Sequence, residues 1–446
     1  MSNLVKTRFS VRVREDYSNT MPDWFLFGHL LSKAGLCPVF LNGETHLTRG
    51  GYRGVEDLIS VHRIYEGYTK TTYRGWRPGM TLFDKTQKRD LTAEEIEKRN
   101  KLKREKPYVH EKITKFDQKV KRGESIAIVR LVYDYRCNFH CQHCSESKVW
   151  KKGMRAFTIN DVKELSRQAD RMGLAHFVIT GGEPLIFPDF DQLVEAIDPN
   201  KFYITTDTNG WYLDKERARH LKSVGVDKIQ LSLDSLSPKE HDEFRRKRGA
   251  HARCLKAIDA ALDAGLNIIV QTVVSKQRAR SSEFVEFLEF LNGKGVGVFV
   301  TYAKPVGGWE GNFEVLVDRD DIEYVRQLEK RYNVFTHFTP SYGLDLGCIA
   351  VKRMISITKY GDVMPCPYIY VSLGNFFDEP LKDIVERGLN IKFFGKYYNG
   401  CWIAENRRFI DEYLVKRIYG KPLPVPYHEV FYESDFINPD ERRLCR

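Results

Sequence analysis

Three cysteines on one short loop are the residues of this chain whose type and spacing most clearly predict chemistry. Cys137, Cys141 and Cys144 form a CxxxCxxC run directly after a short apolar segment. Three thiolates at this spacing can hold three irons of a four-iron cluster and leave the fourth iron without a protein ligand. A substrate or cofactor can coordinate such an open iron. The spacing therefore predicts a reactive cluster rather than a simple electron store.

Zinc is the main alternative for this loop. Structural zinc takes four ligands, and His140 or His143 is available as a fourth ligand beside the three cysteines. A disulfide framework is not expected, because nine cysteines are spread over 446 residues and the N-terminus shows no signal-peptide pattern. Free thiols, together with apolar runs shorter than a membrane span, predict a protein of the reducing cytosol.

The chain is basic, and its excess of positive charge is uneven. It carries 71 Lys and Arg against 60 Asp and Glu, a net charge of +11, and residues 1–125 hold 25 against 16, a net of +9. Eleven of these cations lie in residues 98–122, behind a capping-box pattern at Thr92 and Glu95 that favours a helix. Such a run is most often a solvated face, and the alternative is a surface that attracts an anionic macromolecule. Hydrophobic residues make up 42% of the chain, which excludes a disordered protein.

From residue 126 onward, short apolar runs alternate with amphipathic helical stretches. The alternation predicts a parallel sheet with right-handed crossovers, either an open doubly wound sheet or an incomplete barrel. Helices are expected over residues 160–172, with Thr158 and Asp161 at the start, and over residues 250–264. The predicted strands cover residues 126–132, 176–180, 202–206, 228–233, 268–274 and 297–302.

In both folds, ligand-binding groups gather beyond the carboxyl ends of the strands. The cysteine loop follows the first predicted strand, and further polar motifs follow the next three. These motifs contain Gly181, Gly182 and Glu183 after the second strand, Thr208 and Asn209 after the third, and Ser232 and Asp234 at the end of the fourth. Each motif is weak alone. Together they predict one rim suited to a small ligand with an amine, a carboxylate and a ribose.

These motifs, in this order and spacing, resemble those of radical S-adenosylmethionine (SAM) enzymes over about residues 126–308. The resemblance implies that the reduced cluster breaks a carbon–sulfur bond of SAM, and that the resulting 5′-deoxyadenosyl radical takes a hydrogen atom from a substrate. It implies cluster ligands at Cys137, Cys141 and Cys144, and a Glu183 that accepts a hydrogen bond from the SAM ammonium. The full set of implied SAM contacts is Gly181, Gly182, Glu183, Thr208, Asn209, Ser232, Asp234 and Arg253, with Arg245 as a competing arginine. His143 stands where many family members carry an aromatic residue near the adenine.

A second group of cysteines follows the predicted barrel. Residues 355–365 read as a β-hairpin with a turn at residues 360–362, which brings the flanking Cys348 and Cys366 together. This pattern resembles the start of the SPASM, or shorter twitch, extension of radical SAM enzymes. The resemblance implies one auxiliary iron–sulfur cluster, with Cys401 as the third ligand and Cys445 as the candidate fourth. The alternatives are a non-cysteine fourth ligand, an open site for substrate, or a zinc or single-iron centre.

The expected fold class is α/β. We expect a partial (β/α)6 TIM-like barrel of the radical SAM type over residues 126–310. An α+β N-terminal domain is expected over residues 1–125, and a small twitch-like domain over residues 311–446. Within residues 1–125, residues 23–31 predict a buried helix. Residues 71–78 mix arginine with aromatics, which suits an ordinary turn or, alternatively, stacking on nucleic-acid bases.

The expected function is that of a radical SAM oxidoreductase or maturase acting on a peptide or small molecule. The auxiliary cluster would aid electron transfer or bind the substrate. The implied partners are SAM and an electron donor such as flavodoxin or ferredoxin, and no membrane partner is expected. One alternative is modification of a nucleotide or nucleic acid docked on the basic N-terminal domain. The other is a zinc-stabilised binding protein without catalysis.

Overall fold

The computed structural model describes residues 9–11, 37–41, 44–48, 93–149, 151 and 153–437. The chain divides into two compact units, Met1–Arg77 and Pro78–Arg446. In the first unit, β1 (Phe9–Val11), β2 (Cys37–Leu41) and β3 (Glu44–Thr48) form an antiparallel sheet in the order β1-β3-β2. The predictions made for residues 23–31, for residues 71–78, for the Thr92 cap and for Cys445 fall outside the described residues.

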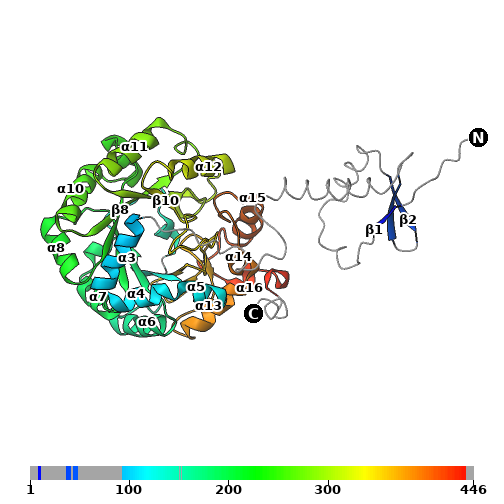
Figure 1. Ribbon diagram of the computed structural model, residues 1–446, viewed down its shortest axis with the longest axis horizontal. Helices are drawn as coiled ribbons and strands as arrows, with labels where there is room; N and C mark the ends of the chain where they lie inside the picture. Colours follow the sequence, from blue (N-terminus) through cyan, green and yellow to red (C-terminus); the bar gives the residue numbers. More distant parts are fainter. Residues whose placement is uncertain are drawn as a thin grey trace, which may run out of the picture. The chain divides into compact units, whose positions relative to one another are not determined.

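A mostly parallel sheet forms the centre of the second unit, and helices surround it as an outer ring (Figure 1). Its strand order is β10-β9-β8-β7-β6-β5-β4-β11-β12. The six predicted strands are confirmed within two residues at either end. They are β4 (Ile128–Asp134), β5 (His176–Gly181), β6 (Tyr203–Thr208), β7 (Lys228–Ser232), β8 (Asn267–Val274) and β9 (Gly297–Tyr302). The partial (β/α)6 barrel is therefore confirmed.

The helices between the strands begin where the sequence supplies a capping side chain. Thr158 and Asp161 form a capping box at the start of α6, as predicted, and Asp214, Ser237 and Ser281 cap later helices. The ring consists of α6 (Ile159–Arg171), α7 (Phe190–Ile197), α8 (Lys215–Ser223), α9 (Pro238–Arg245), α10 (Ala250–Asp263), α11 (Ser282–Gly293) and α12 (Arg319–Leu328). Their apolar faces pack against the strands in one continuous core.

Two further elements extend the sheet at its edges. β10 (Val334–Thr336) runs parallel to β9 at one edge. At the other edge, β11 (Met354–Ile357) runs parallel to β4 and pairs with β12 (Val363–Met364) in an antiparallel hairpin. The hairpin is the one that the sequence predicts. Its attachment to β4, with Ile355 opposite Val129, is a feature that the sequence did not reveal.

The remainder of the chain adds short elements beside the hairpin. They include α13 (Leu381–Leu389), which begins directly after Pro380, and several elements that no sequence pattern marked. These are β13 (Val371–Ser372), α14 (Lys392–Gly395), α15 (Arg407–Phe409), a π-helix (Ile410–Val415), β14 (Val425–Pro426) and α16 (Tyr427–Val430). Buried aromatic rings hold them together, with Phe393 in contact with Trp402, Phe409, Tyr413 and Phe431.

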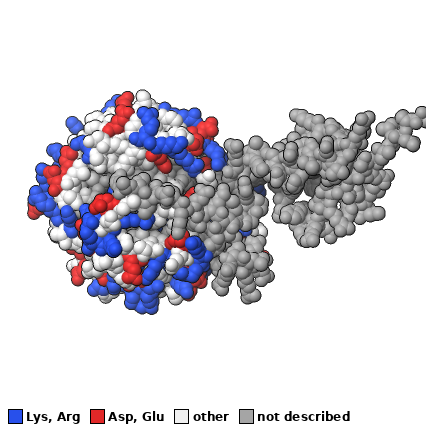
Figure 2. All heavy atoms as spheres, in the orientation of Figure 1, with Lys and Arg blue, Asp and Glu red and all other residues white. Residues whose placement is uncertain are grey.

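The basic run of residues 98–122 forms α3 (Ala93–Glu105), α4 (Pro107–Thr114) and α5 (Phe116–Lys121). Several of its cations are turned inward rather than solvated. Lys106 pairs with Asp227 at 2.6 Å, and Lys112, which is 6% exposed, pairs with Asp170 at 2.6 Å. Elsewhere on the visible face, Lys and Arg are interspersed with Asp and Glu (Figure 2). No helix among the described residues is long and apolar enough to span a membrane.

Candidate active site

The first cysteine loop leaves the carboxyl end of β4 and is held by main-chain hydrogen bonds from three other segments. The amide of Gly182 donates to Asp134 O at 2.8 Å, and the amide of Glu183 donates to Arg136 O at 2.9 Å. The amide of Gly308, beyond β9, donates to Cys144 O at 3.1 Å. Loops that follow β5 and β9 thus fix the start and the end of the cysteine loop.

Glycine is required where these segments meet, because the backbones lie too close for a side chain. A Cβ atom on Gly182 would lie 1.9 Å from Arg136 O, and one on Gly181 would lie 2.1 Å from Asp134 O. On the other side, a Cβ atom on Gly308 would lie 2.1 Å from Gln142 O. The Gly-Gly pair after β5 was predicted as a direct contact to SAM. The structure shows that the pair supports the cysteine loop, and its contact to SAM stays a prediction.

Glu183 is 1% exposed and accepts three hydrogen bonds. Its Oε1 accepts from Thr208 Oγ1 at 2.6 Å and from the Leu185 amide at 3.1 Å, and its Oε2 accepts from the Asn209 amide at 2.7 Å. An ionised carboxylate offers about four acceptor positions, so one remains. Burial raises the pKa of Glu183 to about 7 in spite of these donors. A cation such as an ammonium group would use the remaining position and favour the ionised form.

Thr208 and Asn209 were predicted as SAM contacts, and in the structure both are bound to Glu183. The Asn209 side chain also donates to Asn138 Oδ1 at 2.8 Å, which ties the loop after β6 to the cysteine loop. The two residues therefore position Glu183 and the cysteines. Whether they also touch SAM stays a prediction.

A buried ion pair lies beside the cysteine loop. Arg245 Nε donates to Asp234 Oδ2 at 2.7 Å, and Arg245 Nη2 forms an ion pair with the same oxygen at 2.7 Å. Arg245 Nη1 lies 3.9 Å from Cys141 Sγ. Burial alone would raise the pKa of Asp234, but Arg245, the neighbouring histidines and the Val273 amide together outweigh burial and hold this pKa at about 2. Asp234 was predicted to support a ribose contact at Ser232. In the structure it holds Arg245 and accepts from the Val273 amide at 3.1 Å.

The other predicted rim residues make fewer contacts within the site. Ser232 ends β7, and its hydroxyl makes no hydrogen bond with a described residue. Of the two candidate arginines, Arg245 lies at the cysteine loop, whereas Arg253 is exposed on α10 with its guanidinium 5.3 Å from the ring centre of Trp211. His143 is stacked on Phe244 with ring centres 4.4 Å apart. Burial lowers the pKa of His143 to about 3, so the ring is neutral.

The second group of cysteines lies around one cavity, and their role as cluster ligands stays a prediction. Cys348, Cys366 and Cys401 all line one cavity, although 53 residues separate the first from the last. Cys348 and Cys401 are each 6% exposed. Burial raises the pKa of the Cys401 thiol to about 11. A thiol this strongly buried ionises when a metal binds it, because the metal replaces the proton.

The cavity has a volume of about 960 Å³ and occupies the inside of the barrel. TIM-type barrels usually fill this space with branched apolar side chains. Here, inward-facing positions of successive strands carry polar residues instead. They include Arg130 on β4, Asp207 on β6, Lys228 and Gln230 on β7, Gln271 on β8 and Thr301 on β9. A polar lumen of this size is built for a ligand and not for packing.

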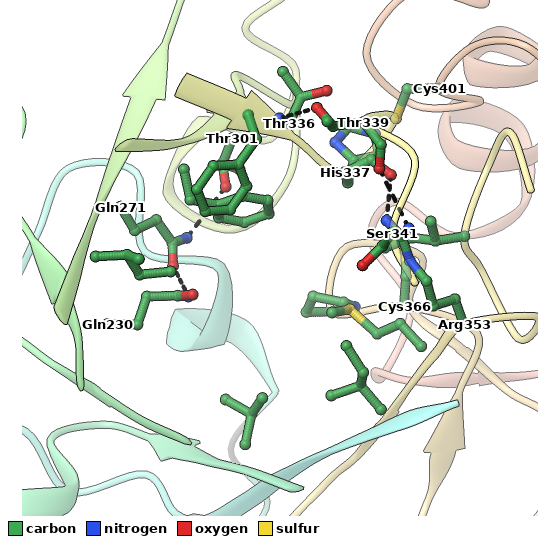
Figure 3. A pocket seen from close by; sticks show the side chains of 18 of the residues that line it. Gln230, Gln271, Thr301, Thr336, His337, Thr339, Ser341, Arg353, Cys366 and Cys401 are labelled. Atoms are coloured by element: carbon green, nitrogen blue, oxygen red, sulfur yellow. Dashed lines mark hydrogen bonds between the residues drawn. The ribbon is translucent and has the colours of Figure 1, made fainter. Parts of the chain in front are cut away.

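A row of hydrogen-bonded side chains runs along one wall of this lumen toward the second cysteine group. The Gln230 amide donates to Gln271, and Gln271 donates to Thr301 Oγ1 at 3.2 Å. Thr301 is in turn hydrogen bonded to Tyr368, two residues beyond Cys366. Figure 3 shows the row on one wall of the cavity and Cys366, Cys401, His337 and Arg353 on the opposite wall. The sequence analysis did not predict these lumen residues. Polar residues alternate with apolar ones along the strands, and this alternation was not interpreted as the inner face of a barrel.

Each cysteine group offers the soft thiolate donors that iron–sulfur clusters require. The first group lies on a loop that neighbouring segments hold in place, and the second lines the lumen. Within the described residues, no three His, Cys, Asp or Glu side chains are arranged to hold a single metal ion. In a four-iron cluster, by contrast, each thiolate binds its own iron. The donor types therefore fit clusters at both places.

Two family models match the chain over the two cysteine groups. Residues 132–291 match the radical SAM superfamily, and residues 348–402 match the SPASM iron–sulfur cluster-binding domain. A GTP 3′,8-cyclase of Nautilia profundicola is 29% identical over 57% of this chain and 83% of its own length. An AdoMet-dependent heme synthase of Methanosarcina barkeri is 25% identical over 56% of this chain and 79% of its own length. The crystal structure of Streptococcus suis SuiB bound to precursor peptide SuiA superposes with a TM-score of 0.48 and 19% identity, over 75% of this chain and 79% of SuiB.

Proposed function

Because this chain belongs to the radical SAM superfamily through residues 132–291 and carries a SPASM domain, we propose that it abstracts a hydrogen atom from a peptide or small molecule bound in the barrel lumen. SAM and a [4Fe-4S] cluster supply the chemistry, which is reductive cleavage of SAM to methionine and a 5′-deoxyadenosyl radical. The protein must hold both groups, exclude water and position the substrate hydrogen.

The residues of the rim have distinct roles in this proposal. Cys137, Cys141 and Cys144 hold three irons, and the fourth iron is left for the amine and carboxylate of SAM. The remaining acceptor position of Glu183 takes a hydrogen bond from the SAM ammonium. Arg245, fixed by Asp234, is our choice over Arg253 for the arginine nearest to the cofactor, because Arg245 alone of the two reaches the cysteine loop.

One observation carries the proposal: the second cysteine group lines the lumen, and a lumen side chain is hydrogen bonded to the segment that follows the first cysteine group. Arg130 lines the lumen and donates to Glu146 Oε1 at 3.0 Å, two residues beyond Cys144. The second cysteine group lines the same lumen directly. A substrate bound there is within reach of both clusters, which suits a reaction in which a substrate radical is generated and an electron is then exchanged. A flavodoxin or ferredoxin is the proposed external donor, in the reducing cytosol.

We propose that the SPASM domain holds one auxiliary cluster through Cys348, Cys366 and Cys401, with Cys445 as the candidate fourth ligand. We also propose that the chain is divided into three domains, which are residues 1–125, 126–310 and 311–446. The domain comparison supports an auxiliary cluster in this region, and the shared cavity supports these three cysteines as its ligands.

Iron analysis of cysteine variants, after anaerobic reconstitution, tests the two cluster assignments. Cys141→Ala should lose about four irons and all SAM cleavage under dithionite. Cys366→Ala should also lose about four irons but keep some cleavage to 5′-deoxyadenosine. Cys254→Ala is the matched control, because Cys254 is buried but belongs to neither group. A colourless wild-type protein with stoichiometric zinc would overturn the proposal, as would a Cys141→Ala variant that still cleaves SAM.

A nucleotide substrate is the second candidate, and the charge of the lumen favours it. Lys228 and Arg353 line the cavity, and neither has a carboxylate within 4 Å among the described residues. A relative is named for a reaction of GTP. Calorimetry with GTP tests this candidate: saturable binding that Lys228→Met weakens supports a nucleotide, and heats equal to buffer exclude GTP. Binding to RNA that falls steeply with salt would instead support a nucleic acid.

A further inference from the structure

Two lysines are buried near the second cysteine group without an acidic partner. Lys304 follows β9 and is 6% exposed. Its Nζ donates to Tyr302 O at 2.6 Å and lies 4.3 Å from the ring centre of Tyr368. Lys352 is 1% exposed, and its Nζ donates to Lys396 O at 2.6 Å. Among the described residues, neither ammonium group has a carboxylate within 4 Å.

The negative groups near these lysines are the cysteines and, for Lys352, also Asp345, which lies beyond ion-pair distance. Lys304 lines the same cavity as Cys348, Cys366 and Cys401. Burial lowers the pKa of Lys304, and these three thiols are the groups that oppose the fall. Burial likewise lowers the pKa of Lys352, and Cys348 opposes that fall most. A buried ammonium group is costly without a counter-charge, so the two lysines are suited to an anion at the cysteines.

The first cysteine group has a different electrostatic environment. Arg245 Nη1 lies 3.9 Å from Cys141 Sγ, but Asp234 binds the same guanidinium through one hydrogen bond and one ion-pair contact, each of 2.7 Å. The positive charge of Arg245 is therefore largely neutralised by Asp234. Among the described residues, no carboxylate lies within ion-pair distance of the two lysines of the second group, and the more distant Asp345 acts on Lys352 less than Cys348 does. The two cysteine groups thus differ in the uncompensated positive charge beside them.

We propose that Lys304 and Lys352 raise the reduction potential of the auxiliary cluster, so that it accepts an electron more readily than the first cluster does. This inference rests on the proposed function, because it requires an iron–sulfur cluster at the second cysteine group. One-electron reduction adds a negative charge to the cluster, and two fixed cations in a low-dielectric interior stabilise that added charge. The first cluster must reduce a sulfonium ion, and the neutralised Arg245 leaves its potential low.

The test is a redox titration followed by electron paramagnetic resonance. Its background is the Cys137→Ala/Cys141→Ala/Cys144→Ala variant of the full chain, so that only the auxiliary cluster is present. Lys304→Met and Lys352→Met should each lower the equilibrium constant for one-electron reduction about tenfold, which is 59 mV toward more negative potential. Lys304→Arg keeps the charge and should return the potential close to that of the parent.

Lys112→Met is the matched control, because Lys112 is also 6% exposed but pairs with Asp170 and lies on α4. If Lys304→Met and Lys352→Met bind iron and titrate within error of Lys112→Met, the inference is overturned while the proposed function stands. If Lys352→Met fails to fold, the Lys304→Met and Lys304→Arg pair decides alone. A parent variant that holds no iron overturns the proposed auxiliary site itself, and with it the inference.

Discussion

Replacing Gly308 by alanine should disrupt the first cysteine loop from a position that carries no chemistry of its own. Gly308 lies in the segment after β9 and packs directly against the main chain of the loop. The added Cβ atom would lie 2.1 Å from Gln142 O, whereas ordinary contacts begin at 3.4 Å. The two backbones must therefore separate by roughly 1 Å.

The cost can be worked from two contributions. Separation breaks the hydrogen bond from the Gly308 amide to Cys144 O, which measures 3.1 Å and is worth about 1 kcal/mol. Overpacking of a close contact costs about 1–3 kcal/mol. We expect Gly308→Ala to lower the free energy of unfolding by about 2–4 kcal/mol. A shift of about 1 Å in a catalytic loop can also reduce the rate about 100-fold.

Urea unfolding, iron content and the rate of SAM cleavage are the measurements. Gly293→Ala is the control, because Gly293 ends α11 and a Cβ atom there meets nothing within 4 Å. The control should be as stable as the wild type or more stable, since alanine favours helix over glycine. If Gly308→Ala matches Gly293→Ala in stability, iron content and cleavage rate, the close packing inferred for this segment is wrong.

The remaining predictions concern the charged residues of the rim and the fourth auxiliary ligand. Arg245→Met should destabilise the apoprotein by about 3–5 kcal/mol in urea unfolding, because it leaves Asp234 buried without its partner. The double variant Asp234→Asn/Arg245→Met should be less destabilised than Arg245→Met alone. An equal or larger loss of stability in the double variant would contradict the pairing. The folded-state pKa of Glu183, about 7, lies above its unfolded value, so the native state holds the proton longer. Wild-type apoprotein should therefore lose stability relative to Glu183→Gln as pH rises from about 4.5 to about 7; a difference between the two proteins that does not change over that window would refute the assignment. Cys445→Ala should lower the iron content of the auxiliary site alone if Cys445 is its fourth ligand, and unchanged iron would assign that position to another group.

The strands and helices of the barrel were predictable because their signals are local. Each strand is an apolar run bounded by turn residues, and Thr158 with Asp161 marks a helix start by chemistry confined to four residues. The pairing of β11 with β4 was not predictable in this way. Met354 lies opposite Ile128, and neither segment contains a local signal that indicates pairing with a strand so distant in the sequence.

The candidate site, like the fold, was predictable from the sequence only in part. The order of the motifs along the chain indicated which loops meet at the rim, because parallel strands place their carboxyl ends together. It did not indicate that Asp234 binds Arg245, or that Thr208 and Asn209 bind Glu183. Those contacts depend on side-chain directions within a crowded rim. The inward turn of Lys106 and Lys112 was missed for a related reason, because a charged residue reads as solvated until its buried partner is known.

The attachment of β11 to β4 makes the SPASM region a part of the barrel wall. Removing the chain from residue 347 onward would strip β4 of one neighbour along Ile128–Leu131 and expose a row of main-chain donors and acceptors. Such an exposed edge invites pairing with another chain. The two cysteine groups therefore share one continuous sheet, and the span between them is set by strand geometry rather than by a hinge. A shortened chain that kept only the barrel would therefore be prone to aggregate.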